Sequence, residues 1–231
     1  MKQERHARRR GTTAPHRNGE AADAALFEHP AERERGVAHK GCETLYRDDL
    51  REAVRVVNAG GVILYPTDTI WGIGCDATNA DAVRRVYDIK RRADSKALIT
   101  LVDSVAKVAA MVPDMPDVAW DMVELSTEPL TIIYETARMV ADNLKAEDGS
   151  LAIRVTREEF SRLLCQRVKR PLVSTSANVS GEPAPRCFAD ISSEILDAVD
   201  YVCTSRRDET HNPPASRIVK LGKGGEVKLI R

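Results

Sequence analysis

The stretch YPTDTIWGIG, residues 65–74, decides how the rest of the sequence is interpreted. It follows the apolar run 62–65, which is typical of a buried strand. Pro66 cannot donate a hydrogen bond to a strand ladder, so we expect the strand to end there. The polar and glycine residues that come next are more than a hairpin turn requires. We therefore expect this stretch to present polar groups to a ligand.

The two threonines of this stretch are its best candidates for ligand contact. In an extended segment, Thr67 and Thr69 point to one side and Asp68 to the other. Threonine hydroxyls suit an amino acid or a sugar, and Gly72 and Gly74 would let a ligand or a neighbouring backbone come close. The alternative is a capped turn whose hydroxyls bond only to its own backbone.

The composition is that of an ordinary globular protein. The chain has 231 residues, 35 basic and 35 acidic side chains and 42% hydrophobic residues, which suffices for a sizeable core. A net charge of zero gives no global field for nucleic acid or membrane. No apolar run reaches the roughly 18 residues of a membrane span, and no secretory signal is present. The five scattered cysteines indicate reduced thiols in a cytoplasmic protein.

Residues 1–43 differ in composition from the rest. They contain Arg8-Arg9-Arg10, four of the five histidines and few large apolar residues. We interpret them as a disordered N-terminal tail, and a basic arm that touches RNA is the alternative. Because only His211 remains in the rest of the chain, we expect no general-base chemistry by histidine there. Residues 44–231 then form one domain, since no linker or internal repeat interrupts them.

Apolar periodicity predicts an α/β fold for residues 44–231. Helical and strand-like patterns alternate irregularly, with some strands adjacent, which favours a mixed sheet over a purely parallel one. Asp48-Asp49 is the candidate cap of the first helix, and Gly60-Gly61 ends it. The expected helices span 48–59, 79–89, 104–111, 117–125, 158–167 and 191–199. The expected strands span 62–65, 97–102, 130–134, 150–155, 171–176, 201–204, 216–221 and 227–230.

Common nucleotide-binding and hydrolase signatures are absent from the sequence. It has no Gly-x-x-x-x-Gly-Lys-Ser/Thr, no complete Gly-x-Gly-x-x-Gly and no Gly-x-Ser-x-Gly. These patterns supply backbone donors to phosphates or an exposed serine nucleophile. A nucleotide site in this chain must therefore use side-chain cations and donors from loops.

The segment KRRADSK, residues 90–96, offers such cations. If the chain leaves the second helix extended, Lys90 and Arg92 face the same way and converge on one anion, with Lys96 reaching in from further on. Arginine supplies a fork that matches phosphate, and lysine supplies a compact charge. The alternative is that these cations only complement the C-terminal end of the helix dipole.

The segment PLVSTSANVSGEPAP, residues 171–185, offers small polar groups. If the strand stays extended, Ser174, Ser176 and Asn178 line one face of its end. Three polar side chains at the end of a buried strand need partners, which a ligand would supply. The alternative is a serine- and asparagine-rich turn that hydrogen-bonds to itself.

Together these stretches resemble the YrdC/TsaC family of threonylcarbamoyl-AMP synthases. The resemblance rests on GGVILYPTDTIWGIGCDATN, on Lys-x-Arg at Lys90 and Arg92 with Lys96 following, on LAIRV at 151–155 and on STSANVSGEPAP, in this order. It covers about residues 45–231. It implies the YrdC-like α/β fold, a twisted mixed sheet with helices around a large open cationic cavity.

The resemblance also implies a reaction. Members of this family join L-threonine, bicarbonate and ATP, with magnesium on the phosphates, into L-threonylcarbamoyladenylate, and they release pyrophosphate and water. The product feeds the threonylcarbamoyladenosine modification of tRNA, which a separate transferase complex completes. The implied partners are the three substrates, that complex and weakly bound tRNA. Attack of a carbamate on the α-phosphorus requires positioned anions and neutralised charge rather than a covalent nucleophile, which agrees with the absence of a triad.

Position by position, the resemblance assigns roles to residues of this sequence. The implied catalytic set is Lys90, Arg92, Ser176 and Asn178. The implied ATP-binding set is Arg92, Lys96, Thr131, Ser176 and Arg231. The implied threonine-binding residues are Thr69 and Ser216, and Thr67, Arg154 and Ser174 complete the pocket. No metal ligand from the protein is implied.

Several positions depart from the family pattern. Trp71 stands where tyrosine is common, and we expect it in the core or at its rim. Ala93 and Ala97 replace the usual prolines, which should only loosen loops. Glu128-Pro129 replaces Pro-Gly-Pro, and Arg217 replaces a threonine.

Three other functions compete with synthesis of the adenylate. A YciO-type relative that binds RNA or nucleotides is the main alternative, and the Ser-x-Asn at 176–178 argues against it. The carbamoyl-transfer protein of hydrogenase maturation has a similar domain within a much longer chain that carries zinc-finger cysteines. A pure RNA-binding module needs an aromatic stacking surface or a basic stripe, but aromatics make up only 4% of this sequence.

Overall fold

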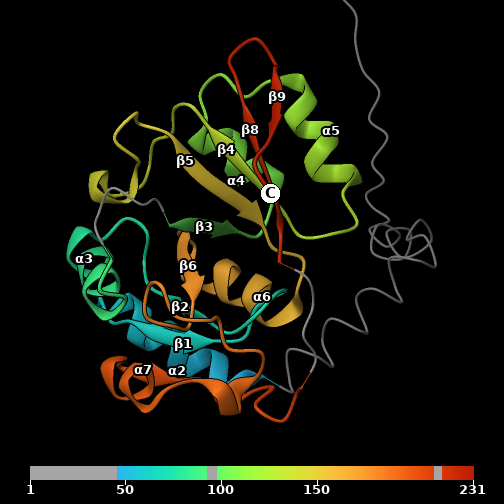
Figure 1. Ribbon diagram of the computed structural model, residues 1–231. Helices are drawn as coiled ribbons and strands as arrows, with labels where there is room; N and C mark the ends of the chain where they lie inside the picture. The colour runs from blue at the N-terminus through green and yellow to red at the C-terminus, as the bar shows by residue number, and fades with distance from the viewer. Residues whose placement is uncertain (1–45, 93–97, 211–214) are drawn as a thin grey trace, which may run out of the picture. The chain divides into compact units, whose positions relative to one another are not determined.

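The structure, a computed structural model, describes residues 46–92, 98–210 and 215–231, so the predicted tail over 1–43 lies outside the described residues (Figure 1). The strands are β1 (Ile63–Tyr65), β2 (Gly72–Gly74), β3 (Ile99–Val102), β4 (Leu130–Tyr134), β5 (Leu151–Val155), β6 (Leu172–Ser176), β7 (Tyr201–Val202), β8 (Arg217–Leu221) and β9 (Val227–Leu229). The helices are α2 (Arg47–Asn58), α3 (Ala80–Ile89), α4 (Val105–Met111), α5 (Asp117–Leu125), α6 (Glu159–Val168) and α7 (Ser193–Ala198), with 3-10 turns η1 (Asp142–Leu144) and η2 (Phe188–Asp190).

The strands form one mixed sheet in the order β7-β1-β2-β6-β3-β5-β4-β8-β9. The pairs β1–β7, β3–β5 and β4–β8 are parallel, and the other neighbouring pairs are antiparallel. Helix α2 packs on β1, β7 and α6, while α4 packs on β3, β5 and α5 (Figure 1). The predicted α/β class with a mixed sheet is confirmed.

The sequence did not predict strand β2, which lies between β1 and β6. Its two glycines have low strand propensity, so no strand was expected at 72–74. A Cβ atom at Gly74 would lie 2.5 Å from Cε1 of Tyr65 and 2.6 Å from the carbonyl oxygen of Val173. The group that approaches this glycine closely is therefore the Tyr65 ring, together with the β6 backbone.

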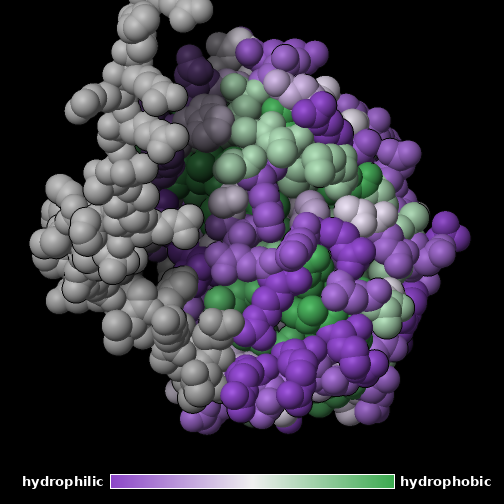
Figure 2. All heavy atoms as spheres, turned by 180° about the vertical axis from the view of Figure 1, so that it is seen from behind, coloured by the Kyte–Doolittle hydropathy of each residue, from purple (hydrophilic) through white to green (hydrophobic). Residues whose placement is uncertain are grey.

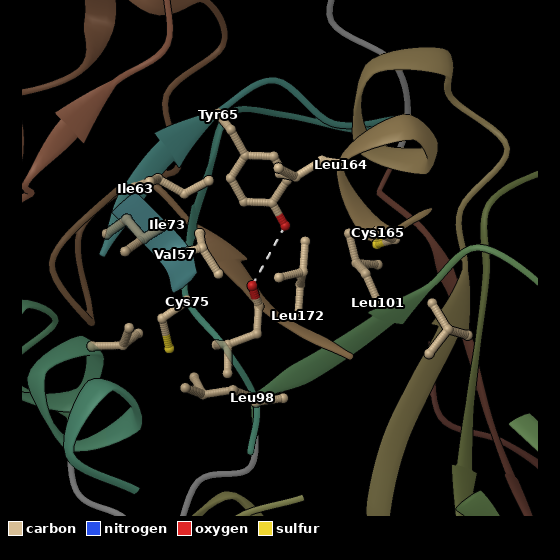
Figure 3. Close-up of a cluster of buried hydrophobic side chains, with 14 of the residues drawn as sticks. Val57, Ile63, Tyr65, Ile73, Cys75, Leu98, Leu101, Leu164, Cys165 and Leu172 are labelled. Carbon is tan, nitrogen blue, oxygen red and sulfur yellow. Dashed lines mark hydrogen bonds between the residues drawn. The ribbon is translucent and has the colours of Figure 1, made fainter. Parts of the chain in front are cut away.

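Tyr65 lies fully buried in the hydrophobic core (Figure 3). Figure 3 shows its ring among side chains from several elements, including Ile73 of β2, Leu164 of α6 and Leu172 of β6. Its hydroxyl donates to the carbonyl oxygen of Val173 at 3.4 Å. Burial raises the pKa of Tyr65 above its ordinary value, so the hydroxyl stays neutral in the core.

The predicted cap of the first helix is wrong. Helix α2 begins after Tyr46, and no side chain caps it. The carboxylate of Asp49 instead accepts hydrogen bonds from the Tyr201 hydroxyl at 2.6 Å and from the backbone amides of Ser205 and Thr204 at 2.7 and 2.9 Å. Although burial opposes the change, these bonds lower the pKa of Asp49. Asp49 therefore ties α2 to the loop that follows β7.

The surface of the described residues is mixed in character. On the face seen in Figure 2, hydrophobic side chains gather in patches between hydrophilic ones. Strand β9 forms one edge of the sheet, and its Val227 and Leu229 side chains are exposed. In the described part of the chain, no helix combines the length and apolar character needed to cross a membrane.

We predict that Gly74→Ala destabilises the fold by about 1–3 kcal/mol, because the added Cβ must displace the Tyr65 ring or the β6 backbone. Denaturant unfolding of the wild type and the variant measures this difference. Gly72→Ala in the same strand is the matched control, since its Cβ would meet no atom closer than 3.2 Å. Equal losses for the two variants would contradict the importance of the Tyr65 contact.

Candidate active site

A cavity of about 670 Å³ opens along the sheet, lined by residues of β2, β3, β5, β6 and β8 and of the loops after β1 and β6. Its lining includes most of the residues singled out in the sequence, namely Thr67, Thr69, Trp71, Gly72, Arg92, Arg154, Ser174, Ser176, Ser216 and Arg231. The antiparallel register sets Gly72 opposite Ser176. This pairing brings the loop after β1 and the end of β6 to the same wall of the cavity.

The loop after β1 has the predicted alternation. The hydroxyl oxygens of Thr67 and Thr69 lie 3.2 Å apart on one side, while Asp68 faces Arg154 on the other. Thr67 also holds the loop together, since its hydroxyl donates to the carbonyl of Ile70 at 2.7 Å and accepts from the amide of Thr69 at 3.1 Å. The capped-turn alternative thus describes Thr67, whereas Thr69 is half-buried and lines the cavity.

Arg154 and Asp68 form an ion pair in the cavity wall. The Nη1 atom of Arg154 lies 3.3 Å from Oδ1 of Asp68, and the Arg154 side chain is only 4% exposed. Its Nε atom is buried and has no hydrogen-bond partner in the structure. Burial raises the pKa of Asp68, and the charge of Arg154 only partly offsets this rise. The pair therefore leaves donor capacity on Arg154 for an anion.

The end of β6 matches the prediction for two of its three polar residues. Ser174 and Ser176 line the cavity, but Asn178 does not. The chain turns after β6, so the side-chain amide of Asn178 donates to the carbonyls of Val179 at 3.0 Å and Glu182 at 2.7 Å. The expectation of one continuous polar face is wrong for Asn178, because the segment does not stay extended to that residue.

Lys90 lies beneath the cavity wall rather than in the cavity. Its Nζ atom donates to the backbone carbonyls of Ser176 and Asn178, each at 2.6 Å, and its side chain is almost fully buried. Residue 90 keeps helical dihedral angles and caps α3, and the positive φ of Arg91 then turns the chain. The expectation that Lys90 and Arg92 converge on one anion is therefore wrong, because only Arg92 lines the cavity.

The pKa of Lys90 is lower than that of an ordinary lysine. Burial, and to a lesser extent the charge of Arg92, lower the pKa of Lys90 to about 8. Burial also lowers the pKa of Arg92. Both effects have the same physical cause, since a cation loses hydration energy in the interior.

The start of β8 brings three polar residues together. The hydroxyl oxygens of Thr131 and Ser216 lie 3.0 Å apart, and both residues are buried. The guanidinium group of Arg231 donates to the carbonyl of Ser216 at 3.1 Å. Ser216 and Arg231 line the cavity, while Thr131 lies behind Ser216.

The lining of the cavity carries positive charge. Four arginines line it, Arg92, Arg154, Arg186 and Arg231, and no acidic side chain is among the described lining residues. Lys96 lies outside the described residues, so its position relative to the cavity is not given. Sequence reasoning missed Arg186, which follows the last proline of GEPAPR and belongs to no cluster of cations.

The described residues offer no metal cage of their own. Within the described ranges, no group of three or more histidine, cysteine, aspartate or glutamate side chains is placed to hold a metal ion.

The sequence is similar to those of known proteins. The family model Sua5_yciO_yrdC, described as telomere recombination, matches residues 55–231. The threonylcarbamoyl-AMP synthase of Coxiella burnetii is 31% identical over 179 residues, which make up 77% of this chain and 96% of that protein.

Two solved structures have a similar fold. The crystal structure of P. abyssi Sua5 complexed with L-threonine has a TM-score of 0.71 at 22% identity, over 79% of this chain and 53% of that chain. The crystal structure of E. coli YciO has a TM-score of 0.69 at 20% identity, over 79% of this chain and 87% of that chain.

The buried Lys90 predicts a specific dependence of stability on pH. Between pH 8 and the ordinary lysine pKa of 10.5, the unfolded chain keeps the Lys90 proton and the folded chain releases it. Stability therefore rises with pH in this window, and this contribution is lost as the pH falls to about 8. The rise is at most about 3.5 kcal/mol, since each tenfold change in proton affinity is worth about 1.4 kcal/mol.

Denaturant unfolding of the wild type and of Lys90→Met across pH 7.5–10.5 tests this prediction. The difference in free energy of unfolding between wild type and variant should increase with pH. Taking the difference between the two proteins cancels the titration of all other groups. Parallel pH profiles would show that Lys90 titrates normally.

Proposed function

The chain belongs to the Sua5–YciO–YrdC family, and on that basis we propose that it is a threonylcarbamoyl-AMP synthase. It joins L-threonine, bicarbonate and ATP into L-threonylcarbamoyladenylate, with release of pyrophosphate and water. The observation that carries this proposal is a cavity of about 670 Å³ that combines threonine hydroxyls with four arginines. Such a site suits several anionic substrates that must be held together.

The chemistry requires positioning more than a reactive side chain. The amine of threonine first becomes a carbamate by joining the carbon of bicarbonate, and water is lost. A carbamate oxygen then attacks the α-phosphorus, and the bond to the bridging oxygen of pyrophosphate breaks. Holding the two anions in contact and neutralising the charge on the phosphate supplies most of the catalysis.

The phosphates of ATP lie, in our proposal, along Arg92, Ser176 and Arg231. All three residues line the cavity, and a guanidinium fork matches the oxygen geometry of a phosphate. Lys96 is the further cation that we assign to the phosphates, although it lies outside the described residues. Magnesium would enter as part of the substrate, bound to the phosphates.

Threonine lies, in our proposal, beside the phosphates, because Arg231 donates to the carbonyl of Ser216 at 3.1 Å. Thr69 and Ser216 offer hydroxyls there, and Thr131 orients the Ser216 hydroxyl through their 3.0 Å contact. Arg154 lines the cavity, and its guanidinium group suits the carboxylate of threonine. Thr67 and Ser174 complete the cavity wall.

Lys90 and Asn178 support the site from behind. Because Lys90 holds the carbonyls of Ser176 and Asn178, it fixes the turn that presents Ser176 to the cavity. Asn178 closes the same turn through Val179 and Glu182. We therefore assign them positioning roles, and only Arg92 and Ser176 of the four implied catalytic residues contact substrate.

The product adenylate is a mixed anhydride of a carbamate and a phosphate, and it is the substrate of a later enzyme. We propose that a tRNA threonylcarbamoyl transferase complex in the cytoplasm consumes it, with weak tRNA binding by this chain. The alternative, an RNA- or nucleotide-binding protein without synthase activity, finds no support in the name of the curated relative. The similarity to E. coli YciO concerns the fold alone at 20% identity.

The proposal predicts that the purified full chain releases pyrophosphate from MgATP only when both threonine and bicarbonate are present. Omitting either substrate should reduce the rate to background, because the nucleophile is the carbamate made from both. A coupled pyrophosphate assay measures the rate. Release without threonine and bicarbonate, or no release with the full mixture, would argue for the nucleotide- or RNA-binding alternative.

Arg92→Gln should lower kcat/KM for ATP by roughly 100-fold, the usual effect of losing one charge-stabilising donor. The matched control is Arg91→Gln, since the neighbouring Arg91 forms an exposed pair with Glu194 at the surface. The control should retain activity within about twofold, because exposed ion pairs contribute little. Equal losses in both variants would remove Arg92 from the site.

A further inference from the structure

Arg186 has no role in the mechanism proposed above. It lines the cavity, and no hydrogen bond or ion pair involves its guanidinium group within the described part of the chain. By contrast, Arg154 pairs with Asp68, and Arg231 is bound to the carbonyl of Ser216. Among the described residues no carboxylate forms an ion pair with Arg186, and Glu209, which lines the adjoining hollow, pairs with Arg206 instead.

The backbone around Arg186 is firmly placed. The carboxylate of Asp190 accepts from the amides of Arg186 at 3.0 Å and Cys187 at 3.3 Å. Pro185 is buried beside it. The next residues form η2, whose Phe188 ring packs on Trp71 with 4.9 Å between ring centroids. These contacts hold the base of the Arg186 side chain at the rim of the cavity.

Arg186 shares a wall of the cavity with Thr69. A small hollow adjoins the cavity, and the residues that line both are Thr67, Thr69, Ile70, Trp71 and Arg186. Arg92 and Ser176 line the main cavity but not this hollow. Arg186 therefore lies on the side of the cavity that the loop of residues 67–71 forms.

The carbamate of threonine presents more negative groups to the cavity than one arginine can neutralise. The carbamate of threonine carries two carboxylates, the α-carboxylate and the new carbamate group. Arg154 is partly neutralised by Asp68 and suits one of them. Building on the function proposed above, we propose that Arg186 binds the carboxylate oxygens that arrive as bicarbonate and become the carbamate.

In this role Arg186 acts before and during the transfer. It holds bicarbonate while the threonine nitrogen bonds to the carbon and the hydroxyl group leaves with a proton as water. The guanidinium group then keeps one carbamate oxygen while the other bonds to the α-phosphorus. The bond from that phosphorus to the pyrophosphate oxygen breaks, and pyrophosphate leaves with the electron pair. Arg186 forms no covalent bond and gives up no proton in either step.

Steady-state kinetics of Arg186→Gln in buffer depleted of carbon dioxide tests this role. With ATP and threonine saturating, the KM for bicarbonate should rise roughly tenfold or more, as expected for losing a charge-assisted hydrogen bond. The Kd of an ATP analogue with a methylene group between the α- and β-phosphorus atoms should stay unchanged in calorimetry. Arg186→Lys should recover part of the affinity for bicarbonate, because it keeps the charge.

Arg84→Gln is the matched control, since Arg84 is exposed on α3 and lines none of the described cavities. An unchanged KM for bicarbonate in Arg186→Gln, a rise in the KM for threonine alone, or weaker binding of the ATP analogue would overturn the assignment. A wild-type protein that makes no adenylate would instead overturn the proposed function. The two failures are therefore distinguishable.

Discussion

The contact between the Tyr65 ring and Gly74 sets the arrangement on which the cavity depends. Because the ring occupies the space of a side chain at position 74, only glycine lets β2 lie between β1 and β6. That position of β2 brings Gly72 opposite Ser176. The polar loop of residues 66–71 then stands beside the end of β6. A packing requirement in the core thus determines where the hydroxyl groups meet the cations.

The described cations in and beneath the cavity wall fall into two groups with different partners. Lys90 lies in the interior, where two backbone carbonyls replace its lost water. Arg92, Arg154, Arg186 and Arg231 line the cavity, where anionic substrates can complete their bonding. The first group fixes the shape of the wall and the second supplies the charge. This division is what a preorganised electrostatic site requires, since the dipoles and charges are in place before the substrate arrives.

The sequence predicted the α/β class and the alternation of Thr67, Asp68 and Thr69, because strand periodicity extends into the loop. It missed β2, since propensity disfavours a strand with two glycines and only the Tyr65 contact explains it. The orientations of Lys90 and Asn178 were wrong, because each depends on where the backbone leaves regular structure. Arg186 was not predicted as a site residue, because a single arginine in a loop belongs to no sequence motif. Only the folded chain brings it to the cavity.

The burial of Lys90 has a consequence for chemical labelling. While the wall is closed, burial lowers the pKa of its amine to about 8, so part of the population is neutral near that pH. Yet the side chain is only 1% exposed beneath the turn of residues 176–178. An acylating reagent reaches this amine only when the turn opens. The rate at which Lys90 is acylated thus reports how often the wall of the cavity opens, and a ligand that holds Ser176 in place should slow it.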